Sequence, residues 1–149
     1  MQDTLPIHFA PLQGYTEAIY RNAHDAFFGG VDTYYTPFVR LEKGNFRRRD
    51  VRGIEPENNG VPHLIPQLIA SSAEKAEVIL SLFIEKGYQE VDINLGCPFP
   101  LLAKRHNGSG ILPYPEEVKA LLSIVTRYPQ ISFSVKMRLG WEQPDECLA

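Results

Sequence analysis

Short apolar stretches alternate along this chain with longer amphipathic ones, and this alternation constrains the fold more than any other feature. Five stretches have the β-branched, aromatic or apolar composition typical of strands, and they span residues 7–10, 32–38, 63–67, 90–94 and 131–137. Three stretches have helical periodicity, over residues 16–28, 71–86 and 114–128. Strands that alternate with helices of this length predict βαβ units and a parallel sheet.

Side-chain chemistry predicts where the first two helices begin and end, and which faces they bury. Thr16 is expected to cap the first helix, and Gly29 and Gly30 to end it. Its inward face is expected to carry Ile19, Ala23, Ala26 and Phe27. Ser71 and Glu74 have the spacing of a capping box at the start of the second helix. The inward residues expected there are Ala76, Ile79, Leu80 and Phe83.

The five strands fit either an open doubly wound sheet or the first five strands of an eight-stranded barrel, which takes roughly 250 residues. In a β/α barrel the functional residues gather at the carboxyl ends of the strands. Each predicted strand here ends in a polar or reactive group, in order Gln13, Arg40, Gln67, Cys97 and Lys136. The sequence therefore favours a parallel β/α barrel (TIM barrel) with a site assembled from many strands.

The charge is concentrated in one segment. The whole chain has 15 basic and 18 acidic residues, a net charge of −3, yet residues 40–52 hold six basic residues against two acidic ones. Such a patch suits contact with a polyanion at one face. The alternative is a solvated loop whose arginines pair with neighbouring acids.

Two classes of protein are excluded by composition. No apolar run reaches the roughly 18 residues that a membrane helix needs. The two cysteines, Cys97 and Cys147, lie 50 positions apart without a CxxC spacing, so neither a disulfide framework nor a zinc site is indicated. We therefore expect a cytoplasmic protein without a membrane partner.

Three segments together resemble the tRNA-dihydrouridine synthase family. They are APLQGYT at residues 10–16, VDINLGCP at residues 91–98 and VKMRLGW at residues 135–141. Residues 36–40 and 66–68 also fit, and the match spans essentially the whole chain. The Asn94-Leu95-Gly96-Cys97-Pro98 element is the most specific part.

The resemblance implies a barrel enzyme that binds FMN and reduces the C5=C6 bond of a uridine in tRNA. NADPH, or NADH, would recharge the flavin. The reduction needs a hydride at one carbon and a proton at the other, and the protein must supply the acid. Cys97, on a turn directly after a strand, is the expected acid.

The resemblance also assigns roles to other strand-end residues. The residues expected to bind the flavin are Pro11, Leu12, Gln13, Gln67 and Lys136, where Lys136 places positive charge beside the flavin ring. Those expected to contact the substrate or the tRNA are Arg40, Asn94 and Arg138, with Asn94 either reading the flipped base or supporting the Cys97 loop.

Two departures from the family pattern stand near Cys97. Pro100 occupies a position where the family often has a lysine, and residues 107–112 read NGSGIL, close to the usual glycine-rich pattern but not identical. Family members would continue through three more strands and a helical tRNA-binding domain. We therefore expect residues 1–149 to be the N-terminal portion of an FMN-binding barrel domain, inactive alone and prone to self-association through an exposed half-barrel edge.

Two other functions stay open from the sequence. One is a related FMN barrel dehydrogenase that acts on a free pyrimidine, against which the basic segment argues. The other is a non-catalytic RNA-binding or assembly fragment that keeps the scaffold without the cofactor.

Overall fold

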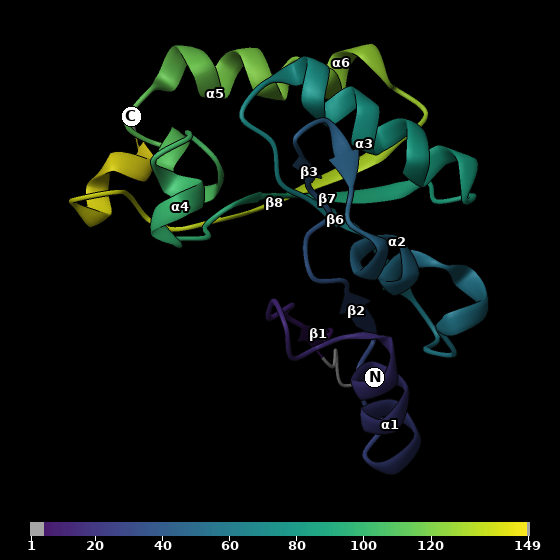
Figure 1. The fold of residues 1–149 in the computed structure, drawn as a ribbon. Helices are drawn as coiled ribbons and strands as arrows, with labels where there is room; N and C mark the ends of the chain where they lie inside the picture. Colours follow the sequence, from purple (N-terminus) through teal and green to yellow (C-terminus); the bar gives the residue numbers. More distant parts are fainter. Residues whose placement is uncertain (1–4, 149) are drawn as a thin grey trace.

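A computed structural model describes residues 5–148 and shows parallel strands that are neighbours in chain order (Figure 1). The first sheet contains β1 (His8–Phe9), β2 (Thr33–Tyr35) and β5 (Leu64–Ile65). The second contains β6 (Gln67–Leu68), β7 (Glu90–Leu95) and β8 (Ser132–Met137). All four pairings within these two sheets are parallel, which confirms the predicted βαβ organisation.

The third predicted strand is divided at Pro66 between these two sheets. β5 pairs with β2 and β6 pairs with β7, because proline has no N–H to continue a ladder. A parallel bridge between Val39 and Leu68 connects the two sheets, and the Val39 N–H donates to the Gln67 carbonyl at 2.8 Å. Five strand positions thus follow one another in the order of a β/α barrel. Among residues 5–148 they do not close into one.

One face of the second sheet is covered by helices. α3 (Ala73–Glu85), α5 (Pro115–Leu122) and α6 (Ile124–Arg127) lie on the same side of it (Figure 1). The four predicted inward residues of α3 are all buried in the main core. The cap of α3 is Ser72 rather than Ser71, and its hydroxyl accepts from the Lys75 N–H at 3.5 Å.

The strand β7 separates an apolar face from a polar one. Val91, Ile93 and Leu95 belong to the core beneath the helices. Asp92 and Asn94 alternate with them and are buried as well. Since strand side chains point alternately to opposite faces, a polar layer lies on the face of β7 away from the helices.

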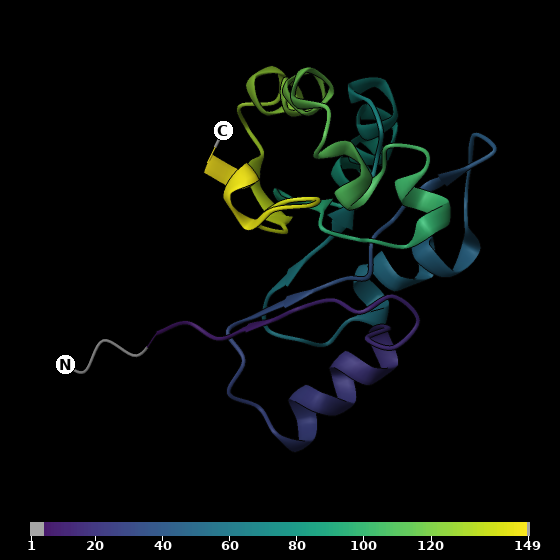
Figure 2. The ribbon, with the colours of Figure 1, turned by 90° about the vertical axis from the view of Figure 1, so that its left-hand side faces the viewer.

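Helix α1 (Ala18–Phe27) lies apart from α3, α5 and α6, on the far side of the strands (Figures 1 and 2). The predicted cap is wrong, since Glu17 occupies the capping position and the Thr16 hydroxyl bonds the Leu12 N–H and carbonyl instead. The predicted inward face is also wrong. Its four residues, Ile19, Ala23, Ala26 and Phe27, are all exposed.

Arg21 explains why the opposite side of α1 faces the protein. Its guanidinium is fully buried and donates to the carbonyls of Thr16 at 2.6 Å and Gly53 at 2.8 Å. A third bond, at 2.5 Å, reaches the Asn59 side chain. Burial lowers the pKa of Arg21 to about 10. Directional bonds to a charged group thus orient α1, and its apolar face is left outward.

The basic segment contains elements that the sequence analysis did not predict. β3 (Leu41–Glu42) and β4 (Asn45–Phe46) form an antiparallel hairpin, and α2 (Arg48–Ile54) and a 3₁₀ turn, η1 (Pro56–Asn58), follow. Lys43 and Gly44 at the hairpin turn both have positive φ, 52° and 80°.

The region after β7 is also more structured than the predicted loop. It contains α4 (Pro100–Ala103) and a 3₁₀ turn, η2 (Gly108–Ile111). The helix predicted over residues 114–128 is two helices, α5 and α6, joined at Ser123. A last 3₁₀ turn, η3 (Pro144–Leu148), ends the described chain.

Candidate active site

Cys97 lies on the loop directly after β7, and its backbone is held from both sides. Its N–H donates to the Asn94 side-chain oxygen at 2.9 Å. Its carbonyl accepts from both the N–H and the hydroxyl of Ser109, each at 3.0 Å. The partly exposed side chain packs against Phe38, Ile69 and Leu102. The thiol is therefore accessible while its backbone is fixed.

Gly108 allows the η2 turn to approach Cys97. It has φ +60°, and a Cβ there would lie 2.6 Å from the Cys97 carbonyl oxygen. Both the conformation and the close approach require glycine. The NGSGIL stretch thus supports the Cys97 loop, a role that the sequence analysis did not assign. Pro100, the other departure, is the first residue of α4.

Gln67 and Asn94 are brought together, and a residue that the sequence analysis missed connects them to β8. The Asn94 amide donates to the Gln67 side-chain oxygen at 2.8 Å, and the Gln67 amide donates to Asp92 at 2.6 Å. The other Asp92 oxygen accepts from the Ser134 hydroxyl at 2.7 Å. The available signal was the alternation of Asp92 and Asn94 in one strand, which places both on one face.

Burial controls the electrostatics of this polar layer. It raises the pKa of the Asp92 carboxyl, while hydrogen bonds from Ser134 and Gln67 and the charge of Lys136 lower it in part. Burial also raises the pKa of Tyr35, and the charges of Asp92 and Glu90 add to that rise.

A cavity of about 230 Å³ opens on the same polar layer. It contains two of the predicted flavin residues, Pro11 and Lys136, and its lining is His8, Ala10, Pro11, Tyr35, Asp92, Ser134, Val135 and Lys136. The structure therefore gathers groups from β1, β2, β7 and β8 around one space, together with the strand-end residue Pro11.

The other first-loop residues lie differently. Leu12 is exposed, and its backbone groups are engaged by Tyr15 and Thr16. Gln13 has both its side-chain oxygen and nitrogen buried without a hydrogen-bond partner among the described residues. Buried amide atoms without partners are costly, so Gln13 is the group in this loop most in need of a ligand.

Arg40 lines a second, basic cavity of about 360 Å³. Ile69 and Leu102, which belong to the cluster that Cys97 packs against, line it as well. The basic residues around it come from three segments and are Arg40, Lys43, Lys75 and Arg105. The Arg40 Nη2 atom lies 3.5 Å from Glu42 Oε1. The Nε atom of Arg40 is buried without a hydrogen-bond partner among the described residues. Arg138 is exposed at the end of β8, with its stem beside Gly96.

Within the basic segment, the arginines divide into paired and unpaired groups. Arg47 and Arg49 pair with Asp50, at 2.6 Å and 3.6 Å. In the described part of the chain, Lys43, Arg48 and Arg52 are exposed and have no ion-pair partner. The pairing interpretation thus holds for Arg47 and Arg49, and contact of Lys43, Arg48 and Arg52 with a polyanion stays a prediction.

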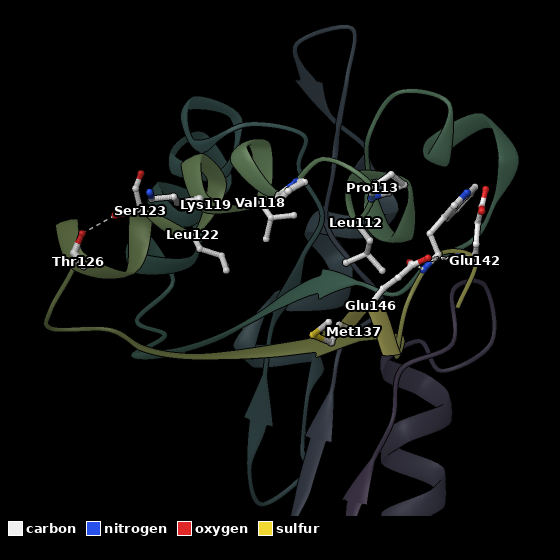
Figure 3. Close-up of a pocket in the computed structure, with 12 residues that line it drawn as sticks. Leu112, Pro113, Val118, Lys119, Leu122, Ser123, Thr126, Met137, Glu142 and Glu146 are labelled. Carbon is white, nitrogen blue, oxygen red and sulfur yellow. Dashed lines mark hydrogen bonds between the residues drawn. The ribbon is translucent and has the colours of Figure 1, made fainter. Parts of the chain in front are cut away.

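Another cavity lies away from these residues. It has a volume of about 1060 Å³ and contains none of the predicted site residues. Figure 3 shows Val118 and Leu122 of α5, together with Leu112, pointing toward Met137 of β8. Its lining also includes Lys119, Ser123, Thr126, Glu142 and Glu146, but no cysteine.

Two further kinds of feature are missing from residues 5–148. No helix there is long and apolar enough to cross a membrane. No group of three or more His, Cys, Asp or Glu side chains could hold a metal ion. The side chain of Cys147 lies outside the described residues.

Comparison with known proteins identifies the family to which this arrangement belongs. A family profile described as dihydrouridine synthase (Dus) matches residues 8–149. The chain belongs to the dihydrouridine synthase family. It is 29% identical over 139 residues to a probable tRNA-dihydrouridine synthase 1 of Synechocystis, and this match covers 89% of the chain. It is also 29% identical over 153 residues to a tRNA-dihydrouridine(16) synthase of Pseudomonas putida, which covers 97% of the chain.

The family match is confined to one part of these synthases. The chain spans 37% of the Synechocystis protein and 47% of the Pseudomonas protein. A tRNA-dihydrouridine synthase B of Klebsiella pneumoniae is 33% identical over 76 residues, which is 51% of the chain and 24% of that relative. The Cys97 loop and the polar layer lie within residues 8–149, which the family profile matches.

Proposed function

We propose that this chain provides the Cys97 side of the active site of an FMN-dependent tRNA-dihydrouridine synthase. The reaction is reduction of the C5=C6 bond of a uridine in tRNA. The observation that supports it most is the Cys97 loop, which is fixed by Asn94 and Ser109 at the carboxyl end of β7. In this proposal residues 1–149 are the N-terminal portion of the FMN-binding barrel domain.

The residues present fit a flavin. Gln13 has an amide whose donor and acceptor are both unused, and Lys136 and Pro11 line the neighbouring cavity. An isoalloxazine ring presents alternating donors and acceptors along one edge, so amide side chains suit it. Gln13 and Gln67 would hold that edge, Lys136 would favour the reduced anionic ring, and Pro11 and Leu12 would form the wall of the site.

The chemistry requires a hydride at one carbon of the uracil and a proton at the other. FMN in its reduced form, restored by NADPH or NADH, supplies the hydride when it is bound. The Cys97 Sγ donates its proton to the second carbon and recovers one from water. Fixing the Cys97 backbone keeps the thiol in one position relative to the substrate, which is what general acid catalysis needs.

The basic cavity is suited to binding the phosphate backbone of the tRNA. Arg40, Lys43 and Arg105 surround it, and phosphate contacts with such side chains position an RNA without reading its sequence. Arg138 would approach the substrate from β8. Asn94 uses its oxygen for the Gly96 and Cys97 N–H groups and one amide hydrogen for Gln67, which leaves one hydrogen for the uridine.

The test combines flavin binding with turnover. The absorbance of the purified protein with FMN is recorded from 300 to 550 nm. Dihydrouridine formation with tRNA and NADPH is then measured for the same residues joined to the rest of a barrel domain. Cys97→Ala should lower the rate by about 100-fold or more and keep the flavin spectrum. Cys147→Ala, the cysteine without a motif, is the matched control and should keep the rate.

Other results would contradict the proposal in distinct ways. Reduction of free uracil in place of tRNA would indicate the pyrimidine dehydrogenase alternative. Binding of tRNA without flavin binding, and with no effect of Cys97→Ala, would indicate a non-catalytic RNA-binding module.

A further inference from the structure

We propose that Asp92 is a positioning residue whose carboxylate orients the amides of Gln67 and Asn94 in series and so fixes the Cys97 loop. That this orientation serves catalysis rests on the proposed function. That Asp92 orients the two amides does not. The bonds form one path from Asp92 through Gln67 and Asn94 to the N–H groups of Gly96 and Cys97. Their lengths are 2.6, 2.8, 3.1 and 2.9 Å in that order.

The path has a direction because its two ends are chemically fixed. Both Asp92 oxygens accept hydrogen bonds, from Gln67 and from Ser134, as an ionised carboxylate does. At the other end the N–H groups of Gly96 and Cys97 can only donate. Between these ends lie two side-chain amides, each of which can in principle turn by 180° and exchange its donor with its acceptor.

The carboxylate orients the amides from one end, as the Gly96 and Cys97 N–H groups do from the other. Because Asp92 only accepts, Gln67 must turn its N–H₂ toward it and its oxygen toward Asn94. Asn94 must then donate to Gln67 and turn its own oxygen toward Gly96 and Cys97. All three side chains are buried, at 3% exposure or less for Asp92 and Gln67 and 8% for Asn94, so water does not replace a bond that is lost.

Reversal would place like groups against each other. If Asn94 turned, its N–H₂ would face the N–H groups of Gly96 and Cys97, and both donors would lose their shared acceptor. Ser109 would still hold the Cys97 carbonyl. The expected result is a loop anchored on one side, with the thiol no longer confined to one position.

Asp92→Asn tests this, since the new amide keeps the shape of the side chain and can face Gln67 with either group. Amide hydrogen exchange at Gly96 and Cys97 is measured by NMR in the absence of flavin and tRNA. We expect exchange about tenfold faster, the change that loss of one buried hydrogen bond produces. Ser134→Ala is the matched control. It removes a bond to Asp92 outside the path and should leave exchange at both groups unchanged.

The double variant Asp92→Asn with Asn94→Asp distinguishes orientation from burial of a charge. A carboxylate at position 94 accepts from Gly96, Cys97 and a reversed Gln67, and the amide at position 92 donates to Gln67 and accepts from Ser134. Every donor is again paired, so protection of Gly96 and Cys97 should return to within about twofold of the wild type. FMN affinity should be lower than that of the wild type, because the Gln67 amide is reversed.

The outcomes are separable from those for the proposed function. Unchanged exchange in Asp92→Asn, or no rescue in the double variant, would overturn the positioning role whether or not the protein reduces tRNA. If Asp92→Asn does not fold, a folded double variant with protected Gly96 and Cys97 still supports the role, and an unfolded one contradicts it. A wild-type protein that binds no flavin would contradict the proposed function alone.

Discussion

Gly108 is the residue on which the Cys97 loop depends most directly. A Cβ there would meet the Cys97 carbonyl oxygen at 2.6 Å, and its φ of +60° is unfavourable for any side chain. We expect Gly108→Ala to lower the free energy of unfolding by about 1–3 kcal/mol and to increase the alkylation rate of Cys97. Urea denaturation and iodoacetamide labelling would measure the two effects.

Gly60→Ala is the control for this substitution. Gly60 has no positive φ, and a Cβ there would meet nothing within 4 Å. Its free energy of unfolding should change by less than about 0.5 kcal/mol. Equal effects of the two substitutions would show that Gly108 has no special relation to Cys97.

Single residues were predictable from the sequence where they belong to a motif. Residues whose role depends only on their contacts in the fold were missed. Gln67, Asn94 and Cys97 were expected near one another because each follows or ends a strand, and the hydrogen bonds bring Gln67 and Asn94 together with the Cys97 loop. Asp92 and Ser109 carry the bonds that hold this group. Alternation places Asp92 on the same face as Asn94, but no motif names either Asp92 or Ser109. Their roles depend on which atoms meet across strands, and one sequence does not contain that information.

Among the elements, the strands were predicted well and the first helix only in part. The alternation along β7 comes from one apolar face in the core and one polar face opposite it, so its sequence pattern is strong. Helix α1 exists where periodicity placed it, but the rule that apolar faces turn inward failed there. Arg21 bonds three partners, and these directional contacts decide the orientation.

The hairpin β3–β4 and the division of the helix after Tyr114 had weaker signals. Each hairpin strand has two residues, too few for an alternation to be visible. The hairpin turn at Lys43 and Gly44 uses positive φ, which a lysine seldom adopts. The change of direction at Ser123 has no Gly or Pro to mark it, so periodicity continued through it.

The Asp92 carboxyl on β7 accepts hydrogen bonds from Gln67 of β6 and Ser134 of β8. Its titration predicts that stability depends on pH. Burial raises the pKa of Asp92 above its ordinary value near 3.8. From about that pH upward, the folded state holds the Asp92 proton more tightly than the unfolded state does. The free energy of unfolding of the wild type, relative to that of Asp92→Asn, should therefore fall as the pH rises through this window.

Ser134→Ala sharpens the pH experiment. Ser134 donates to the charged form of Asp92, so its removal raises the pKa further and should extend the fall to higher pH. Urea denaturation at a series of pH values from 3.5 to about 7 measures both curves. A wild-type difference curve that is flat, or that rises with pH, would contradict the assigned environment of Asp92.

At the scale of the whole molecule, the helices on the two sides of the strands differ in where their apolar residues point. The helices α3, α5 and α6 cover one side, whereas α1 on the other presents its apolar residues outward (Figures 1 and 2). Ile19 and Phe27 are each 84% exposed, and nothing in residues 5–148 covers them. A contiguous apolar face of this kind promotes association in water.

The final prediction concerns this face. Ile19 lies in the first turn of α1 and Phe27 at its last position, so Ile19→Glu and Phe27→Lys place charges where the helix dipole favours them. The double variant should bind less of the dye ANS than the wild type and sediment as a smaller species, with an unchanged circular-dichroism spectrum. Val78→Glu introduces charge at another exposed apolar side chain, on α3, and should change neither property. Dye binding that is equal in the wild type and the double variant would mean that the outward face of α1 is covered in solution.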